Sequence, residues 1–306
     1  MPHEIDRILR MAGQGTWFIH PAKAEQIVAA LALRAQAGPR DDAAFPGTTP
    51  VALNGEARGD QRLVRVLRLH GSILPRANMM TDFSGGVAME RFQAAFRAAA
   101  DDQACSAIVI DIDSPGGQVG LVPETAAMIR AAKRSDRPII AVANTLAASA
   151  AYWIASACDE IVVTPSGEVG SIGVYCIHQE ISEKLAMEGI AVTMISSGPR
   201  KTEGNPFAPL DEPARAAIAA DGAAFYDMFT KDVAKARGVP VSVVRADPET
   251  AERHMGGGRC YGAQMAVKLG MADRVATLDE TLQRLVKGGR SGARRASIER
   301  RRLSLI

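Results

Sequence analysis

The chain has 306 residues, of which 47% are hydrophobic and 23% are charged. These proportions are ordinary for a soluble globular protein with a large core. The formal net charge of +2 implies no acidic partner for the protein as a whole, and aromatic residues make up only 5%. Stacking on bases therefore has little support, and we expect no specific nucleic-acid partner.

The cysteines and the N-terminus bear on compartment. None of the four cysteines lies at metal-ligand spacing, and their neighbours are apolar: Cys105, Cys158, Cys176 and Cys260. This favours reduced thiols in a cytoplasmic protein and predicts no metal or other cofactor. Residues 1–10 lack the apolar run of a signal peptide. The stretch 22–37 carries Lys23, Glu25 and Arg34, so it predicts an amphipathic helix and no membrane span.

Composition divides the chain into four parts. Residues 1–36 favour a helical N-terminal segment, with Trp17-Phe18-Ile19 as a docking point. Residues 37–60 are rich in proline and glycine and indicate a linker. Residues 61–286 predict the compact domain. Residues 287–306 hold seven basic residues and one acidic residue, which is typical of a disordered tail or a polyanion contact.

The compact domain alternates predicted strands and helices. Short apolar, partly β-branched runs predict strands at 63–69, 107–112, 138–143, 161–163 and 192–195. Helical patterns lie at 86–100, 123–134, 147–157, 212–237, 261–269 and 278–286. Strands that alternate with helices predict a parallel sheet and an α/β fold.

Three segments carry chemistry. The sequence Asp113-Ser114-Pro115-Gly116-Gly117 follows the apolar run 107–112, and its glycines allow a sharp turn with exposed backbone N–H groups. Ser149 stands among alanines, where a peptide could approach its hydroxyl. Lys201 follows in a glycine-containing loop. Together these segments indicate a serine nucleophile, an oxyanion hole and a lysine base.

The residues alone leave the general base open. A serine hydroxyl needs a base to remove its proton, and both Lys201 and His178 follow Ser149 in the chain. Histidine titrates near neutrality, whereas a lysine needs burial or a cationic neighbour to do so. Sequence distance does not decide between them, since catalytic partners meet only in the fold.

Other titratable residues near these motifs favour structural roles. His70 opens a His-Gly-Ser turn, and Asp111 and Asp113 end a strand beside a Ser-Pro pair. The two aspartates resemble a catalytic carboxylate pair, but turn formation explains them better.

The order of motifs resembles peptidase family S49, the signal peptide peptidase A family, and within it the phage prohead or capsid assembly proteases. The resemblance covers about residues 63–285 and rests on the segments described, together with 169–174, 259–264 and 269–273. Cues for the phage branch are 17–21, His178 and 201–207. The resemblance implies a ClpP/crotonase-like α/β domain and a Ser–Lys dyad.

The resemblance also assigns roles by position. Ser149 matches the nucleophile and Lys201 the general base. Gly117 matches the oxyanion-hole glycine, with the N–H of Ala150 as second donor. Ser171 stands where a hydroxyl would orient the lysine amine, or where a turn needs a serine.

The resemblance implies a homo-oligomeric serine endopeptidase that cleaves scaffold or capsid proteins during phage head maturation in the host cytoplasm. Three alternatives remain open at this point. The first is a cellular S49 peptidase that degrades signal or misfolded peptides. The second is a crotonase-type acyl-CoA enzyme, and the third is a non-catalytic assembly protein.

Overall fold

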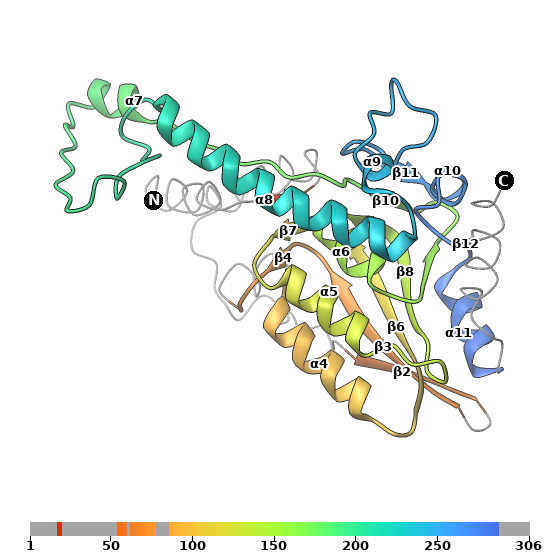
Figure 1. Ribbon diagram of the computed structural model, residues 1–306. Coiled ribbons are helices and arrows are strands. Elements are labelled where there is room, and N and C mark those ends of the chain that lie inside the picture. Colours follow the sequence, from red (N-terminus) through yellow and green to blue (C-terminus); the bar gives the residue numbers. More distant parts are fainter. Residues whose placement is uncertain (1–16, 20–53, 60–61, 78–85, 288–306) are drawn as a thin grey trace.

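The computed structural model describes residues 17–19, 54–59, 62–77 and 86–287, and Figure 1 shows their arrangement. The main sheet has the strand order β11-β10-β8-β6-β3-β2, with β9 beside β8 and β12 beside β9. Its strands are β2 (Asn54–Gly59), β3 (Arg62–His70), β6 (Cys105–Ser114), β8 (Ile139–Ala148), β9 (Glu160–Val163), β10 (Glu168–Gly170), β11 (Cys260–Gly262) and β12 (Arg274–Val275). The pairs β2–β3 and β10–β11 are antiparallel, and the other pairs in this sheet are parallel. The predicted α/β class is confirmed.

Helices cover both faces of this sheet, which explains the continuous apolar runs in its central strands. On one face pack α4 (Met89–Asp101), α5 (Val122–Ala131), α6 (Ala150–Ser156) and α8 (Glu212–Arg237). On the other face, α11 (Leu278–Val286) covers a smaller apolar cluster that includes Val64, Val109 and Val142. The short helices α9 (Val241–Val244) and α10 (Ala263–Lys268) lie near β11 (Figure 1).

A second, four-stranded sheet holds the glycine turn. Its order is β1 (Trp17–Ile19), β7 (Gly116–Gln118), β4 (Ile73–Leu74) and β5 (Val87–Ala88). β7 pairs in parallel with β4 and antiparallel with β1. The motif that follows β6 therefore passes from the main sheet into the small sheet.

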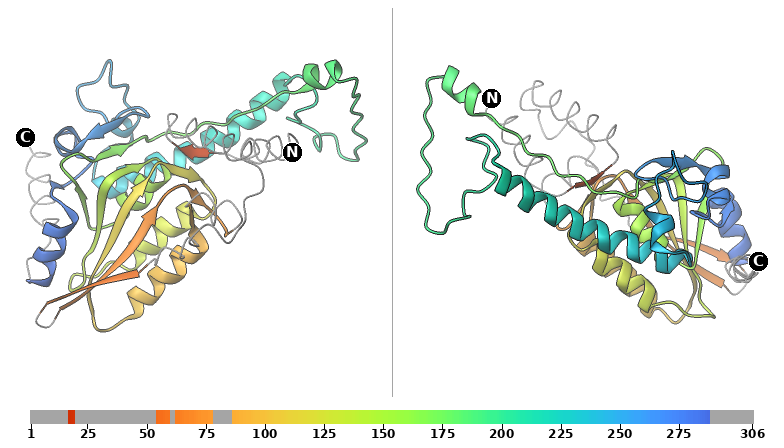
Figure 2. Two further views of the ribbon diagram at one scale, coloured as in Figure 1. Left: turned by 180° about the vertical axis from the view of Figure 1, so that it is seen from behind. Right: turned by 45° about the horizontal axis from the view of Figure 1, so that its top comes forward.

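Residues 174–211 and the first half of α8 form an extension, which we call the arm. Figures 1 and 2 show it projecting from the domain, with α7 (Ser182–Met187) at its outer end. None of the residues of α7 is buried. The chain leaves the domain after β10 and returns along α8, so the arm lies far from the central sheet.

Several predicted boundaries differ from the structure. The helix expected at 147–157 begins only at Ala150, because β8 continues through Ala148. The strand expected at 192–195 is wrong, since these residues are exposed and pair with no strand in the part of the chain that the structure describes. Residues 17–19 are a strand and not part of a helix, and 54–59 form β2 inside the expected linker. The rest of the segments 1–36 and 37–60, and the tail from 288, lie outside the described residues.

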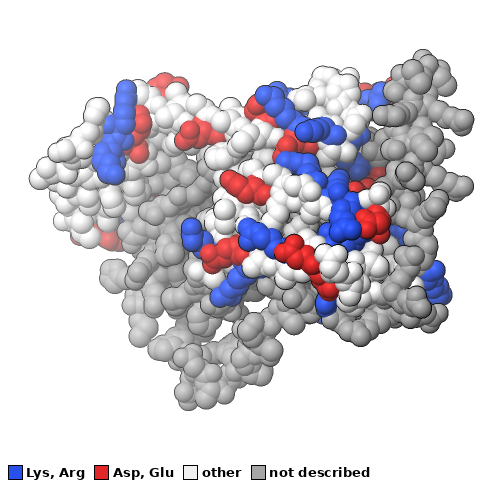
Figure 3. Space-filling view, turned by 60° about the horizontal axis from the view of Figure 1, so that its bottom comes forward, with Lys and Arg blue, Asp and Glu red and all other residues white. Residues whose placement is uncertain are grey.

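The surface mixes charges of both signs. On the face in Figure 3, acidic and basic side chains are interspersed over the described part of the molecule. In the part of the chain that the structure describes, no helix has both the length and the apolar character that a bilayer crossing needs.

Candidate active site

Ser149 lies at a strained junction between a strand and a helix. It follows the last residue of β8 and caps α6, with φ 57° and ψ −119°. Few non-glycine residues adopt positive φ, and such strain persists only where the surroundings impose it. A serine on a sharp strand-to-helix turn is the arrangement that serine hydrolases of other folds use to present a nucleophile.

Hydrogen bonds and packing impose this conformation. The Ser149 N–H donates to the Gly170 carbonyl at 2.8 Å, and the Ser149 carbonyl accepts from the Trp153 N–H at 2.9 Å. Every residue of α6 is buried. The ring of Trp153 stacks on Phe229 of α8 at 4.7 Å between centroids, and its indole N–H donates to Asp232. The helix that begins after Ser149 is therefore held by β10 through Ser149 and by α8 through Trp153.

Strand β7, which contains Gly116 and Gly117, lies beside this junction and is called the glycine strand below. Ser114 at the end of β6 pairs with Ala147 near the end of β8, so the carboxyl ends of both strands meet. β7 follows at once, and α6 contacts it. The Ser114 hydroxyl donates to the Gly71 carbonyl at 2.7 Å and accepts from the Gly116 N–H at 3.2 Å, which holds the turn in place.

Gly117 has no room for a side chain. A Cβ built there would overlap the Ile73 carbonyl oxygen of β4. Glycine is thus required by the close approach of two strands and not by an unusual φ. Ala150 is the first residue of α6, so its N–H has no carbonyl partner within the helix. The predicted oxyanion donors belong to segments that touch each other.

Ser171 is linked to the Ser149 junction through the residue before it, Gly170. It follows Gly170, whose carbonyl binds the Ser149 N–H, and it has φ 53°. Its N–H donates to the Arg259 carbonyl at 2.9 Å. The Ser171 residue also lines a cleft of about 650 Å³ together with Tyr175, Tyr226 and Asp247.

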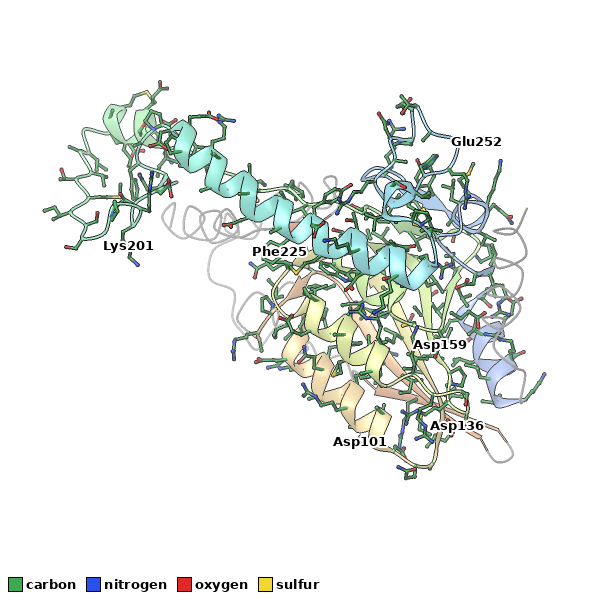
Figure 4. The ribbon with its side chains drawn as sticks, in the orientation of Figure 1. Asp101, Asp136, Asp159, Lys201, Phe225 and Glu252 are labelled. Carbon is green, nitrogen blue, oxygen red and sulfur yellow. The ribbon has the colours of Figure 1, made fainter. Side chains whose placement is uncertain are left out.

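The two candidate bases lie in the arm. Lys201 is exposed in a turn where its N–H donates to the Gly198 carbonyl at 3.2 Å. Figure 4 shows it at the outer end of the arm, away from β8 and α6. His178 contacts the carbonyl of Asn205, which also belongs to the arm, at 3.2 Å. A single chain therefore places Lys201 away from Ser149, and the Ser–Lys dyad stays a prediction.

The remaining predicted residues have structural partners. His70 contacts the carboxylate of buried Asp111 at 3.0 Å, and the Asp113 carboxylate accepts from the Thr145 hydroxyl. Among the described residues, no cluster of three His, Cys, Asp or Glu side chains is arranged to hold a metal ion.

Sequence reasoning missed the strand partner of the glycine segment. β1 pairs with β7 so that Trp17, Phe18 and Ile19 stand opposite Gln118, Gly117 and Gly116. The apolar run 17–19 predicted that this segment docks on the domain. Nothing in the sequence pattern indicated that it would pair with β7.

The fold and the strained serine define an α/β protein with features of a hydrolase. A family model, peptidase family S49, matches residues 131–290. The chain is 30% identical over 240 residues to "Capsid assembly protease C" of Escherichia phage lambda, covering 76% of this chain and 52% of that protein. It is 29% identical to "Putative signal peptide peptidase SppA" of Enterococcus faecium, over 61% of this chain and 52% of the relative.

This chain belongs to peptidase family S49. It spans about half the length of these curated relatives. Among solved structures it is similar to a mutant of ClpP1 from Listeria monocytogenes, with a TM-score of 0.41 and 15% identity, over 71% of this chain and 94% of the other.

Proposed function

We propose that this chain is a serine endopeptidase that cleaves scaffold or capsid proteins during phage head maturation in the host cytoplasm. The observation that carries the proposal is the strained backbone of Ser149, held beside the glycine strand β7. Family S49 membership supports a peptidase, and the lambda relative's printed name supports the phage role.

In the proposed reaction, the Lys201 amine takes the proton from Ser149 Oγ while Oγ attacks the peptide carbonyl carbon. The N–H groups of Gly117 and Ala150 donate to the oxyanion, and each such donor is worth about 3–4 kcal/mol in the transition state. The lysine then gives its proton to the leaving amine. Water attacks the acyl-enzyme, with the same amine as base, and releases Ser149 and the new carboxylate.

The position of the arm supports a dyad in which Lys201 comes from another copy of the chain. In one chain Lys201 lies at the outer end of the arm (Figure 4). The arm also exposes large apolar side chains, with Met187 83% and Ile195 96% accessible. Surfaces of this kind mark protein contacts. The proposal therefore includes a homo-oligomer in which an arm delivers Lys201 to a neighbouring Ser149.

Mixing two inactive variants tests this dyad. Ser149→Ala and Lys201→Ala should each abolish hydrolysis of a fluorogenic peptide. Random mixed oligomers of the two variants should regain about a quarter of the wild-type rate, because each site draws its serine and lysine from different copies. The matched control is Lys184→Ala, a second arm lysine, mixed with Ser149→Ala.

Activity that survives in Lys201→Ala but is lost in His178→Ala would assign the base to His178.

A second measurement separates a peptidase from the non-proteolytic alternatives. A fluorophosphonate should label Ser149 in the wild type and not in Ser149→Ala. Absence of labelling in assembled wild type would favour an acyl-CoA enzyme or an assembly protein. Digestion of candidate capsid and scaffold proteins, followed by mass spectrometry, separates the phage role from a cellular S49 peptidase.

A further inference from the structure

We infer that the chain's own residues Trp17–Ile19 occupy the edge of β7 at which an extended substrate peptide would pair, and that they inhibit the site. This inference rests on the proposed function, because it names how that site takes its substrate and what competes with it. The observation that carries it is the antiparallel pairing of β1 with β7, in which Phe18 stands opposite Gly117.

The small sheet leaves β7 one edge for a partner. Its other edge is taken by β4, through the pair Ile73–Gly117, and the close approach there leaves no space for a Cβ. β1 fills the remaining edge and is itself the last strand of this sheet. An unpaired strand edge presents N–H and C=O groups that bind an added strand, and one edge accepts one peptide at a time.

This edge belongs to the candidate active site. β7 continues directly from β6, whose end pairs with the end of β8 just before Ser149. The helix that Ser149 caps contacts β7. A peptide paired with β7 would therefore run past the nucleophile with its backbone aligned to the proposed oxyanion donor Gly117.

The nucleophile is buried in this structure. Ser149 is only 1% exposed, so a protein substrate does not reach its hydroxyl in this arrangement. A filled peptide edge beside a buried nucleophile is the arrangement of an inhibited peptidase.

The strand geometry supplies a matched pair of variants. Along an edge strand, alternate N–H groups point to the neighbouring strand and to solvent. Either the N–H of Phe18 or those of Trp17 and Ile19 therefore face β7. Proline removes the N–H group but is tolerated at the outward positions of an edge strand. We compare Phe18→Pro with the double variant Trp17→Pro/Ile19→Pro. One of them removes the N–H groups that pair with β7, and the other, which removes only outward N–H groups, is its matched control.

The test measures peptide binding in the absence of hydrolysis. In full-length Ser149→Ala, a fluorescent peptide with the sequence of residues 14–22 is titrated and its anisotropy is followed. We expect weak binding with native β1 and about tenfold tighter binding in the variant that loses the pairing, because competition by β1 is removed. The same peptide with proline in place of Phe18 and Ile19 should not bind. Thermal melts check that each variant is folded.

The outcomes separate this inference from the proposed function. Equal affinity in both proline variants and the parent, or no binding to any of them, would overturn the docking site and its inhibition by β1. If binding tightens but the matching variants with Ser149 intact cleave no peptide or protein, the peptidase proposal fails and the docking site stands. If they cleave faster than the wild type, both are supported.

Discussion

Gly117 has both a packing role and a proposed chemical role, and the sequence indicated only the second. Its Pro-Gly-Gly setting predicted a turn with accessible N–H groups, and the structure adds a reason that no sequence pattern contains. The neighbouring strand β4 approaches so closely that a methyl group would overlap the Ile73 carbonyl. The residue type was predictable, but the contact that requires it was not.

Gly117→Ala should therefore destabilise the domain and abolish activity. Forcing a methyl group into close-packed backbone costs about 2 kcal/mol or more, because β4 and β7 must separate. Thermal unfolding and peptide hydrolysis measure the two effects. Gly262→Ala is the matched control, since a Cβ there meets nothing within 4 Å. Equal melting temperatures for the two variants would contradict the packing argument.

The identity of the base predicts a pH profile. A general base acts only when unprotonated, and amines lose their proton at higher pH than imidazoles. With Lys201 as base, kcat/KM should keep rising from pH 7 into the alkaline range, as long as the fold is intact. A plateau reached near pH 6 would contradict a lysine base and favour His178. Circular dichroism at each pH controls for unfolding.

Burial should slow the alkylation of two cysteine thiols. Burial raises the pKa of both Cys158 and Cys260 to about 12. Only the thiolate reacts with iodoacetamide, so at pH 8 their rates in the folded protein should be roughly a thousandfold below that of a free thiol. Peptide mapping after timed alkylation measures this. Unfolding in urea should restore rapid labelling, and fast labelling of folded Cys260 would contradict the raised pKa.

At the scale of elements, long periodic segments were predictable and short ones were not. The helix expected at 212–237 is α8, and the strand expected at 107–112 lies within β6. The start of α6 was misplaced because alanines suit both a helix and the close-packed end of β8. The apolar run 192–195 resembled a strand, but in the arm it is exposed and pairs with no strand among the described residues.

The site depends on contacts between distant elements, which explains why sequence reasoning reached it only in part. Ser149 and Gly117 were identified by residue type, yet the hydrogen bond from Ser149 to Gly170 and the β1–β7 pairing join segments with no local signature. Both are set by sheet topology. The position of Lys201 on the arm likewise follows from the length of α8 and not from the loop that holds the lysine.

One buried ion pair ties α8 to the sheet. Arg237, at the end of α8, donates to both carboxylate oxygens of Asp273 at 2.9 Å, and both side chains are 5% exposed. Asp273 also accepts from the N–H of Ile161 in β9. Because α8 holds α6 through Trp153, this pair supports the element that positions Ser149.

Arg237→Met should lower the free energy of unfolding by about 3–5 kcal/mol, because Asp273 would remain buried without its partner. Chemical denaturation measures the loss. The matched control is Arg259→Met, whose pair with Glu249 is 62% and 65% exposed on its two side chains. Exposed pairs contribute little, so this control should unfold like the wild type. Equal effects of the two variants would show that burial does not decide the outcome.

At the scale of the whole molecule, the exposed arm has no evident role in a single chain. α7 buries none of its residues, and its Met187 and the nearby Ile195 are almost fully accessible. Figure 1 shows that no other labelled element covers this end. Exposure of this kind is accounted for if copies of the chain associate through their arms, which would also bring Lys201 to a neighbouring Ser149.

The double variant Met187→Glu/Ile195→Glu should therefore weaken self-association and lower peptidase activity together. Burying two charges in an apolar contact between copies is unfavourable, whereas on a free surface it costs little. Light scattering over a range of protein concentrations measures the mass, and peptide hydrolysis is followed in the same samples. Met265→Glu is the control, since Met265 is 44% exposed but lies in α10, outside the arm. The monomer should dominate in the double variant, and its remaining activity should rise with concentration as copies re-associate. An unchanged mass with unchanged activity would remove the arm from the interface, and a wild-type chain that is monomeric and fully active would exclude delivery of Lys201 between copies.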